Sequence, residues 1–176
     1  MSIRPAQLSD ALAIATVHVR SWQSAYRGLL PQDYLDGLDP GKRSAGAERI
    51  LGELDWPRRG VLVAEDAGQV VGFTGFCPSR DADLDPRAVG EVTTIYVLSA
   101  AWGRGHGRAL MGAALDTLGQ AACSQAALWV LDTNQRARRF YEAGGWRTDG
   151  AAKQEPWPGA GFTISEVRYR RPLPRA

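Results

Sequence analysis

Residues 91–118 read EVTTIYVLSAAWGRGHGRALMGAALDTL, and the order of residue types in this segment predicts a local architecture. Residues 92–97 are all β-branched or aromatic, a composition typical of a strand that is buried on both faces. A turn that contains Gly103, Gly105 and Gly107 follows, and apolar residues then recur at helical spacing up to Leu118. The segment therefore predicts a strand, a glycine-rich turn and a helix, in that order.

The glycine-rich turn is a candidate anion site. Its glycines have no Cβ, so an anion can approach the main chain closely. The first N–H groups of the following helix have no partner inside it and carry the positive end of its dipole. Each N–H bond to a charged oxygen contributes roughly 1.5–3 kcal/mol, so a few of them can hold a phosphate. Arg104 and Arg108 add positive charge there. The alternative is a loop that only turns tightly.

The spacing of the glycines excludes two common nucleotide motifs. Residues 103–107 read G-x-G-x-G, whereas the dinucleotide fingerprint is G-x-G-x-x-G. The phosphate loop of nucleoside triphosphatases needs G-K-[ST], and this tripeptide does not occur in the chain.

Two motifs together resemble the GCN5-related N-acetyltransferase (GNAT) family. Residues 91–110, E-x3-I-Y-V-x5-G-x-G-x-G-x2-L, are similar to the acetyl-CoA motif of that family. Residues 134–146, N-x2-A-x2-F-Y-E-x2-G-W, are similar to its second motif and follow in the expected order. The resemblance covers about residues 2–170. It implies a single N-acetyltransferase domain over residues 1–176, of α/β class, with a mixed central β-sheet flanked by helices. It also implies acetyl-CoA as co-substrate and no metal.

The resemblance also implies a set of cofactor-binding residues: Ile95, Val97, Gly103, Arg104, Gly105, Gly107, Arg108 and Asn134. The backbone of residues 95 and 97 would pair with the pantetheine amides, as an added strand pairs with a sheet edge. Asn134 would contact the pantetheine arm, and its position before a helix equally favours an N-cap. Trp102 stands where the family usually has Gln or Arg, so Arg104 or Arg108 would have to supply the charge that this position lacks.

Acetyl transfer to an amine needs a base and an acid. A lysine-like amine has a pKa of about 10.4, so freeing it at neutral pH costs about 4 kcal/mol, and the thiolate leaves more easily if it is protonated. By the resemblance, Tyr141 is the candidate acid beside the sulfur; the alternative is a core aromatic. Glu91 is the candidate base, directly or through water; the alternative is a glutamate in solvent or in an ion pair. Asp132 is a weaker candidate base.

The acceptor side is less defined. Trp22, Tyr26, Tyr34 and Trp157 lie on segments that flank the acceptor in the family, although Trp22 is better explained by core packing. We interpret His18 as a surface histidine, with a pocket wall as the alternative, and His106 as a residue turned away from the phosphate. A closed aromatic pocket would favour a small amine, and an open acidic groove a protein N-terminus or lysine. A CoA-binding regulatory domain without turnover is a third hypothesis.

Composition narrows the class of protein. The 176 residues carry a net charge of +2, which does not favour nucleic acid, and no apolar run is long enough to span a membrane. The two cysteines, Cys77 and Cys123, match no zinc spacing and favour a reducing, cytoplasmic location. A homodimer is possible by analogy with the family. We interpret Arg168–Arg171 as a solvated strand end.

The remaining elements follow from periodicity and turn residues. Ser9 is the expected N-cap of the first helix, with Leu8, Leu12, Ala15, Val19 and Trp22 as its buried stripe. Residues 79–89 should form a surface loop, and residues 156–159 should link the last two strands. Further helices are expected over 10–24, 31–38, 43–54 and 134–143, and strands over 2–5, 61–65, 69–76, 126–131, 147–155 and 162–170.

Overall fold

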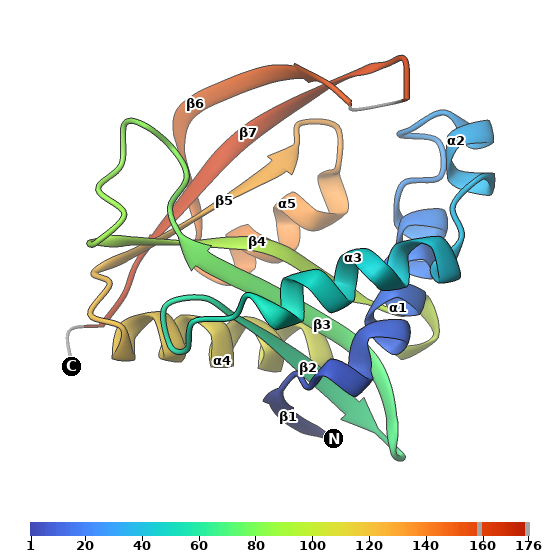
Figure 1. Ribbon diagram of the computed structural model, residues 1–176. Coiled ribbons are helices and arrows are strands. Elements are labelled where there is room, and N and C mark those ends of the chain that lie inside the picture. Colours follow the sequence, from blue (N-terminus) through green and yellow to red (C-terminus); the bar gives the residue numbers. More distant parts are fainter. Residues whose placement is uncertain (158–159, 175–176) are drawn as a thin grey trace.

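The computed structural model describes residues 1–157 and 160–174, and its described strands form one mixed sheet. The order across the sheet is β1-β2-β3-β4-β5-β7-β6, and every neighbouring pair is antiparallel except β4 with β5 (Figure 1). The strands are β1 (Ser2–Pro5), β2 (Gly60–Asp66), β3 (Gln69–Pro78), β4 (Val89–Val97), β5 (Gln125–Leu131), β6 (Arg147–Pro156) and β7 (Thr163–Pro172). The predicted α/β class and mixed sheet are confirmed. Residues 158 and 159 of the expected 156–159 link lie outside the described residues.

Helices cover both faces of the sheet. They are α1 (Ala11–Ala25), α2 (Gln32–Asp36), α3 (Pro40–Gly52), α4 (His106–Gln120) and α5 (Gln135–Ala143). Alternate residues of β2 point to opposite faces, because side chains alternate along a strand. Leu62 and Ala64 belong to the core beneath α4, whereas Val61 and Val63 pack with residues of α1 in a second core. No helix among the described residues is long and apolar enough to cross a membrane.

The two halves of the sheet separate between β4 and β5. These parallel strands pair only at Val89 with Gln125, Gly90 with Ala126 and Glu91 with Ala127. Beyond that point β4 stays paired with β3, across a register irregularity opposite residues 92–94 that bends the strand. Residues 93–97 therefore have no strand neighbour on their β5 side. The prediction that residues 92–97 are buried on both faces is wrong beyond Val92, because Thr93 is exposed and residues 94–97 are only partly buried.

The start of the first helix also differs from the prediction. A 3₁₀ turn, Leu8–Asp10, precedes α1, and the Asp10 carboxylate accepts a hydrogen bond of 2.7 Å from the backbone N–H of Gln7. Ser9 is therefore not the N-cap. Leu8 belongs to this turn, and Leu8 and Leu12 are 63% and 57% exposed, whereas the other three residues of the predicted stripe, Ala15, Val19 and Trp22, are buried as expected. The buried stripe of α1 consists of Ala11, Ile14, Ala15, Val17, Val19 and Trp22.

The interpretation of Arg168 as part of a solvated strand end is wrong. Its guanidinium is buried and forms ion pairs with Asp81 at 3.0 Å, Asp83 at 2.7 Å and Asp149 at 2.8 Å. Asp81 and Asp83 come from the predicted surface loop 79–89, most of which is exposed as expected, and these two carboxylates attach the loop to β7. Local composition could not predict this, because the partners lie far away in the sequence.

Candidate active site

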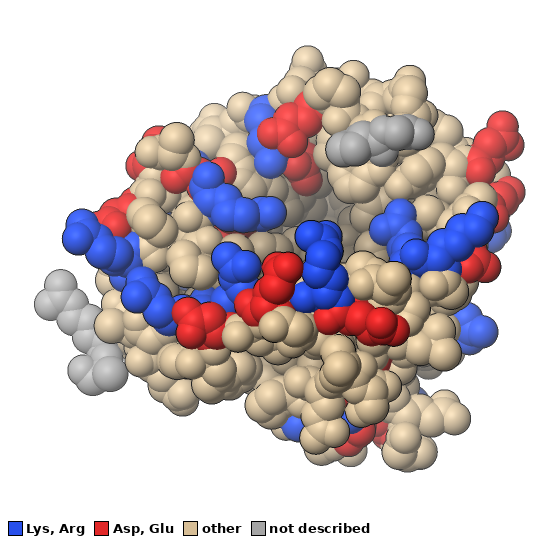
Figure 2. All heavy atoms as spheres, in the orientation of Figure 1, with Lys and Arg blue, Asp and Glu red and all other residues tan. Residues whose placement is uncertain are grey.

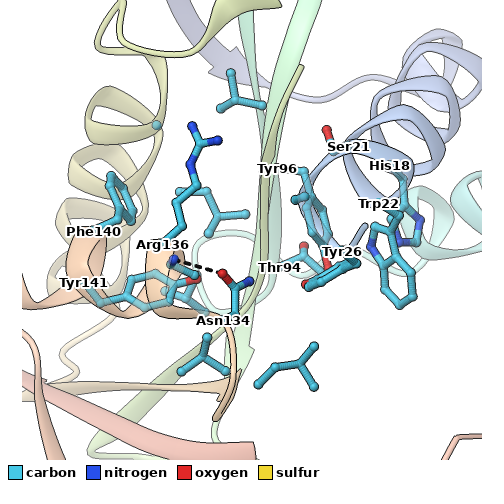
Figure 3. A pocket seen from close by; sticks show the side chains of 18 of the residues that line it. His18, Ser21, Trp22, Tyr26, Thr94, Tyr96, Asn134, Arg136, Phe140 and Tyr141 are labelled. Carbon is cyan, nitrogen blue, oxygen red and sulfur yellow. Dashed lines mark hydrogen bonds between the residues drawn. The ribbon is translucent and has the colours of Figure 1, made fainter. Parts of the chain in front are cut away.

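A cavity of about 700 Å³ occupies the place where β4 and β5 separate. One side of it carries Asn134, Arg136, Phe140 and Tyr141, from α5 and the residue before it. The other side carries side chains of α1 and Tyr96 of β4 (Figure 3). The surface view in Figure 2 shows basic and acidic side chains interspersed, without a continuous basic face.

The glycine turn forms one end of the cavity. Gly103 and Gly105 have φ values of 75° and 89°, which only glycine adopts without strain. Gly105 is the N-cap of α4 and offers no side chain, so the first N–H groups of the helix face the cavity uncapped. Gly103, Gly105, Gly107 and Arg108 all line the cavity. These donors and the positive end of the helix dipole are suited to an anion.

Arg104 does not line the cavity. Its guanidinium forms an ion pair of 2.6 Å with Asp66, at the end of β2. His106, the next residue but one, is 2% exposed, and neither of its ring nitrogens has a hydrogen-bond partner among the described residues. Its Nε2 lies 3.6 Å from the same Asp66 carboxylate. Of the two arginines expected to supply charge, only Arg108 therefore faces the cavity.

Trp102 brings a different arginine to the glycine turn. Its indole N–H donates a 2.7 Å hydrogen bond to the backbone carbonyl of Val97, which fixes the ring against β4. The guanidinium of Arg136 stacks over this ring, 3.1 Å from the ring centre, and both residues line the cavity. Burial lowers the pKa of Arg136. Sequence reasoning missed Arg136, although its position within the second motif could have marked it.

Asn134 and the end of β4 both line the cavity. The Oδ1 atom of Asn134 accepts a 3.1 Å hydrogen bond from the backbone N–H of Ala137, so it is the N-cap of α5. It also lines the cavity, and its amide NH₂ group makes no hydrogen bond within the described residues. Ile95 and Val97 line the cavity on the strand edge that β5 has left. One asparagine thus combines the capping role with a position facing the cavity.

Tyr141 is both a core aromatic and a cavity residue. Its ring packs against Phe140, Trp146 and Tyr169, with centroid distances of 5.5, 6.2 and 6.2 Å. It also lines the cavity, and Figure 3 shows it on the same side as Phe140, Arg136 and Asn134. Burial raises the pKa of this phenol, so Tyr141 is protonated at neutral pH and is available as a donor.

The structure favours the ion-pair alternative for Glu91 over a free base. The carboxylate is 3% exposed and does not line the cavity. It accepts hydrogen bonds from the Arg80 backbone N–H at 3.1 Å, from Nε at 3.1 Å and from Nη2 at 2.5 Å. Asp132, the weaker candidate base, is not part of the cavity wall either.

A different carboxylate, that of Glu166, lines the cavity. It lies on β7 opposite Leu131 and forms an ion pair of 3.3 Å with Lys153. Burial raises its pKa and Lys153 opposes the shift, while the nearby charges of Glu155 and Glu91 raise the pKa further. The sequence offered no local signal for Glu166, because β7 is brought to the cavity only by antiparallel pairing with β5.

Aromatic side chains enclose the other end of the cavity. Trp22 packs edge-on against His18 and Tyr26, with centroid distances of 5.1 and 4.9 Å, and lies 5.2 Å from Trp157. Trp22 is buried and also lines the cavity, so it serves both packing and the pocket wall. Burial raises the pKa of Tyr26 well above its usual value.

His18 is a wall of this pocket, not a surface histidine. It stacks on Tyr96 with a centroid distance of 5.2 Å and lines the cavity. Burial, together with the positive charge of Arg43, lowers its pKa to about 4, so the imidazole is neutral at physiological pH. The alternative that placed His18 in a pocket is the one the structure supports.

Tyr34 supports this end from outside. Its hydroxyl accepts a 2.7 Å hydrogen bond from the indole N–H of Trp157 and a 3.3 Å bond from Nη2 of Arg43. The three residues come from α2, α3 and the chain after β6, so the network joins three segments beside the aromatic end. Tyr34 itself does not line the cavity.

Comparisons with known proteins agree with this geometry. The model of the acetyltransferase (GNAT) family matches residues 22–146. The uncharacterized N-acetyltransferase YuaI of Bacillus subtilis is 35% identical over 147 residues, which span 81% of this chain and 78% of that protein. An uncharacterized N-acetyltransferase of Archaeoglobus fulgidus is 33% identical over 145 residues, 80% of this chain and 89% of the relative.

Solved structures share the fold at lower identity. PaiA N-acetyltransferase from Thermoplasma acidophilum, in complex with coenzyme A, superposes with a TM-score of 0.73 at 17% identity over 98% of both chains. YncA from Salmonella typhimurium, described as a putative acetyltransferase with its cofactor acetyl-CoA, gives a TM-score of 0.71 at 22% identity over 100% of this chain and 95% of that one. With a family match over most of its length and relatives named for the activity, this chain belongs to the GNAT family of N-acetyltransferases.

Proposed function

We propose that residues 1–176 form one N-acetyltransferase domain that moves the acetyl group of acetyl-CoA to the primary amine of a small molecule. The observation that carries this proposal is a single cavity with two different ends. One end offers uncapped main-chain donors at a glycine turn, and the other is enclosed by aromatic side chains. Structural neighbours were crystallised with coenzyme A or acetyl-CoA, which supports the choice of donor.

The diphosphate of the cofactor is assigned to the glycine turn. Backbone N–H groups around Gly103, Gly105 and Gly107 would bind its oxygens, and Arg108 would supply charge from the cavity wall. Arg136 on Trp102 adds a cation close to the position where the family usually has Gln or Arg. Arg104 is held by Asp66 and contributes only to the local field.

The pantetheine arm is assigned to the gap between β4 and β5. Main-chain groups of Ile95 and Val97 would pair with its amides, as an added strand pairs with an open sheet edge. Asn134 would donate from its free amide NH₂ group, since its oxygen already caps α5. This arrangement carries the thioester toward Tyr141.

Transfer is direct. The amine nitrogen attacks the thioester carbonyl, a C–N bond forms, and the C–S bond breaks as the sulfur leaves with the bonding electron pair. The ammonium form of the acceptor loses two protons in all; one ends on the CoA thiol and the other in solvent. Tyr141 donates its phenolic hydrogen to the sulfur and is reprotonated afterwards. Neither Cys77 nor Cys123 lines the cavity, so neither is placed to form a covalent acyl-enzyme.

Glu166 is our candidate base. A carboxylate of ordinary pKa is a weak acceptor for an ammonium proton, and a raised pKa improves the match. Glu91 is bound by Arg80, and we assign it the supporting role of a fixed negative charge near Glu166.

A small acceptor is favoured over a protein segment. The hydrogen bonds of the Tyr34 hydroxyl to Trp157 and Arg43 hold three segments beside the aromatic end, and a pocket lined by aromatic rings suits a small amine. A cytoplasmic location fits the two free cysteines, and a homodimer stays a prediction for light scattering to test.

Two measurements test the proposal. Titration calorimetry should give acetyl-CoA binding at one site per chain, and a panel of primary amines should release CoA thiol in a coupled colour assay. Binding without any thiol release would favour the regulatory, non-catalytic alternative. Absence of binding would overturn the proposal.

A further inference from the structure

The aromatic end of the cavity contains a cation that has no acidic partner. Arg43, on α3, lines the cavity and is partly buried. No carboxylate of the described residues forms an ion pair with it, whereas Arg4, Arg80 and Arg168 each have one. A partly buried cation without a counter-charge attracts an anion more strongly than an exposed cation does, so this position favours an anion that arrives with a ligand.

The surroundings of Arg43 leave it oriented for such an anion. Nη2 donates to the Tyr34 hydroxyl at 3.3 Å, and the guanidinium lies over the Trp22 ring, 5.6 Å from its centre. One face of the Arg43 guanidinium and its Nη2 atom are thus in contact with the protein. The other N–H groups of the planar fork remain for a carboxylate, which guanidinium binds in a bidentate manner.

A negatively charged residue, Glu166, also lines this cavity. Glu166 lies on β7 and Tyr141 lies on α5, whereas Arg43 lies on α3. The rings of Trp22, Tyr26 and Trp157 bound the same space. A ligand that spans it meets a cation, apolar rings and then an acid next to the thioester.

We propose that the acceptor is a small amine that also carries a carboxylate, bound by Arg43, and an apolar or aromatic body, packed against the rings of Trp22 and Trp157 that line the cavity. This inference rests on the proposed function and specifies its acceptor class. The carboxylate determines orientation, because the reversed molecule would put an ammonium against Arg43 and a carboxylate against Glu166. Diamines of the same length are disfavoured because their second ammonium would lie against Arg43.

The test uses matched acceptors that differ only in charge. Phenylalanine, tryptophan and 4-(aminomethyl)benzoate are each compared with their carboxamides, and phenethylamine and 1,4-bis(aminomethyl)benzene complete the panel. We expect kcat/KM for at least one carboxylate to exceed that of its carboxamide by about tenfold or more, mainly through KM, with the diamine poorest. Carboxamides that react as well as their carboxylates would overturn the inference while the transferase assignment stands.

Variants identify the residue responsible. Arg43→Met should abolish the preference for carboxylate over carboxamide, and Arg43→Lys should retain part of it, because lysine keeps the charge and loses the fork. Arg20→Met, on the exposed side of α1, is the matched control and should behave as the wild type. Acetyl-CoA affinity and Tm are measured for each variant to exclude misfolding.

The failures of the two proposals are distinct. A protein that does not bind acetyl-CoA refutes the proposed function. A protein that binds acetyl-CoA and acetylates neutral amines or diamines best, or none of the carboxylates, refutes only the acceptor class. A preference for carboxylate that persists in Arg43→Met would refute the role of Arg43.

Discussion

At the scale of single residues, the site depends on side chains whose chemistry is set by burial. Tyr141 and Glu166 are the proposed proton donor and proton acceptor of the reaction. Burial raises the pKa of both, which keeps the phenol protonated and makes the carboxylate a better proton acceptor. Each can be tested with a nearly isosteric substitution.

Replacing Tyr141 with Phe should lower kcat by about 100-fold, the scale of a lost general acid, while acetyl-CoA affinity changes by about twofold or less. The ring still fills its place among Phe140, Trp146 and Tyr169, so Tm should be nearly unchanged. Steady-state kinetics and calorimetry on the same preparation measure both quantities. Equal kcat values for the two proteins would remove Tyr141 from the mechanism.

The base should be visible in the pH dependence of kcat/KM. Activity should rise with pH through a pKa above the usual glutamate value, because Glu166 must lose its proton before it can accept one. Glu166→Gln should remove this limb and lower kcat/KM by about 100-fold. In Glu91→Gln the limb should persist at lower pH, since a nearby negative charge has been removed. A limb that vanishes only in Glu91→Gln would restore Glu91 as the base.

His18 should make stability depend on pH. Its pKa of about 4 in the folded protein lies below the ordinary value of about 6.5, so the unfolded chain binds a proton first as pH falls. Stability is unaffected above pH 6.5 and is lost progressively down to pH 4, by about 2 kcal/mol at pH 5. Urea unfolding of the wild type and His18→Phe between pH 5 and 7.5 should give a shallower slope for the variant. Parallel slopes would contradict the burial of a neutral imidazole.

At the scale of elements, the strand–turn–helix unit 91–118 and the N-cap of α5 were predictable because their signals are local. Gly103 and Gly105 have positive φ values, and Asn134 caps the helix that begins at the next residue. These roles depend only on the adjacent backbone. The start of α1 was not predictable from local signals. Asp10 binds Arg4 and the backbone N–H of Gln7, and these contacts form a 3₁₀ turn in place of the expected Ser9 cap. His18 was misread for a similar reason, because α1 packs on Tyr96 of a distant strand.

Two glycines of the same helix separate backbone strain from helix propensity. Gly105→Ala should destabilise the protein by about 1–2 kcal/mol and weaken acetyl-CoA binding, because φ there is 89° and an L-residue is strained. Gly112→Ala, inside α4 with no atom within 4 Å of the added Cβ, should stabilise by about 0.5–1 kcal/mol. Thermal unfolding and calorimetry on both variants test this. Similar effects of the two substitutions would refute the role of the turn conformation.

At the scale of the whole molecule, residues from distant segments come together at the cavity, and no local sequence pattern predicts this. Glu166 and Arg43 reach the cavity from β7 and α3, on either side of both motifs. Arg168 joins β7 to the loop 79–88 and to β6. Such contacts require the complete fold, so sequence reasoning found the glycine-turn end of the cavity but neither Glu166 nor Arg43.

Arg168→Met should lower the unfolding free energy by about 3 kcal/mol, because it leaves Asp81 and Asp149 without their buried counter-charge. The matched control is Arg87→Met, which removes the exposed pair with Asp85 and should leave Tm unchanged. Denaturant unfolding at neutral pH compares the two. A loss as small as that of the control would mean that the cluster adds nothing to stability.

The separation of β4 from β5 has a consequence for how such a protein can diverge. On our assignment the donor is held largely by main-chain groups at residues 95–97 and 103–107, which side-chain substitutions cannot remove. The acceptor is held by side chains of α1, α3 and β7, each of which can be exchanged singly. Mutational drift can therefore retarget the molecule to new amines while its supply of acetyl groups stays intact.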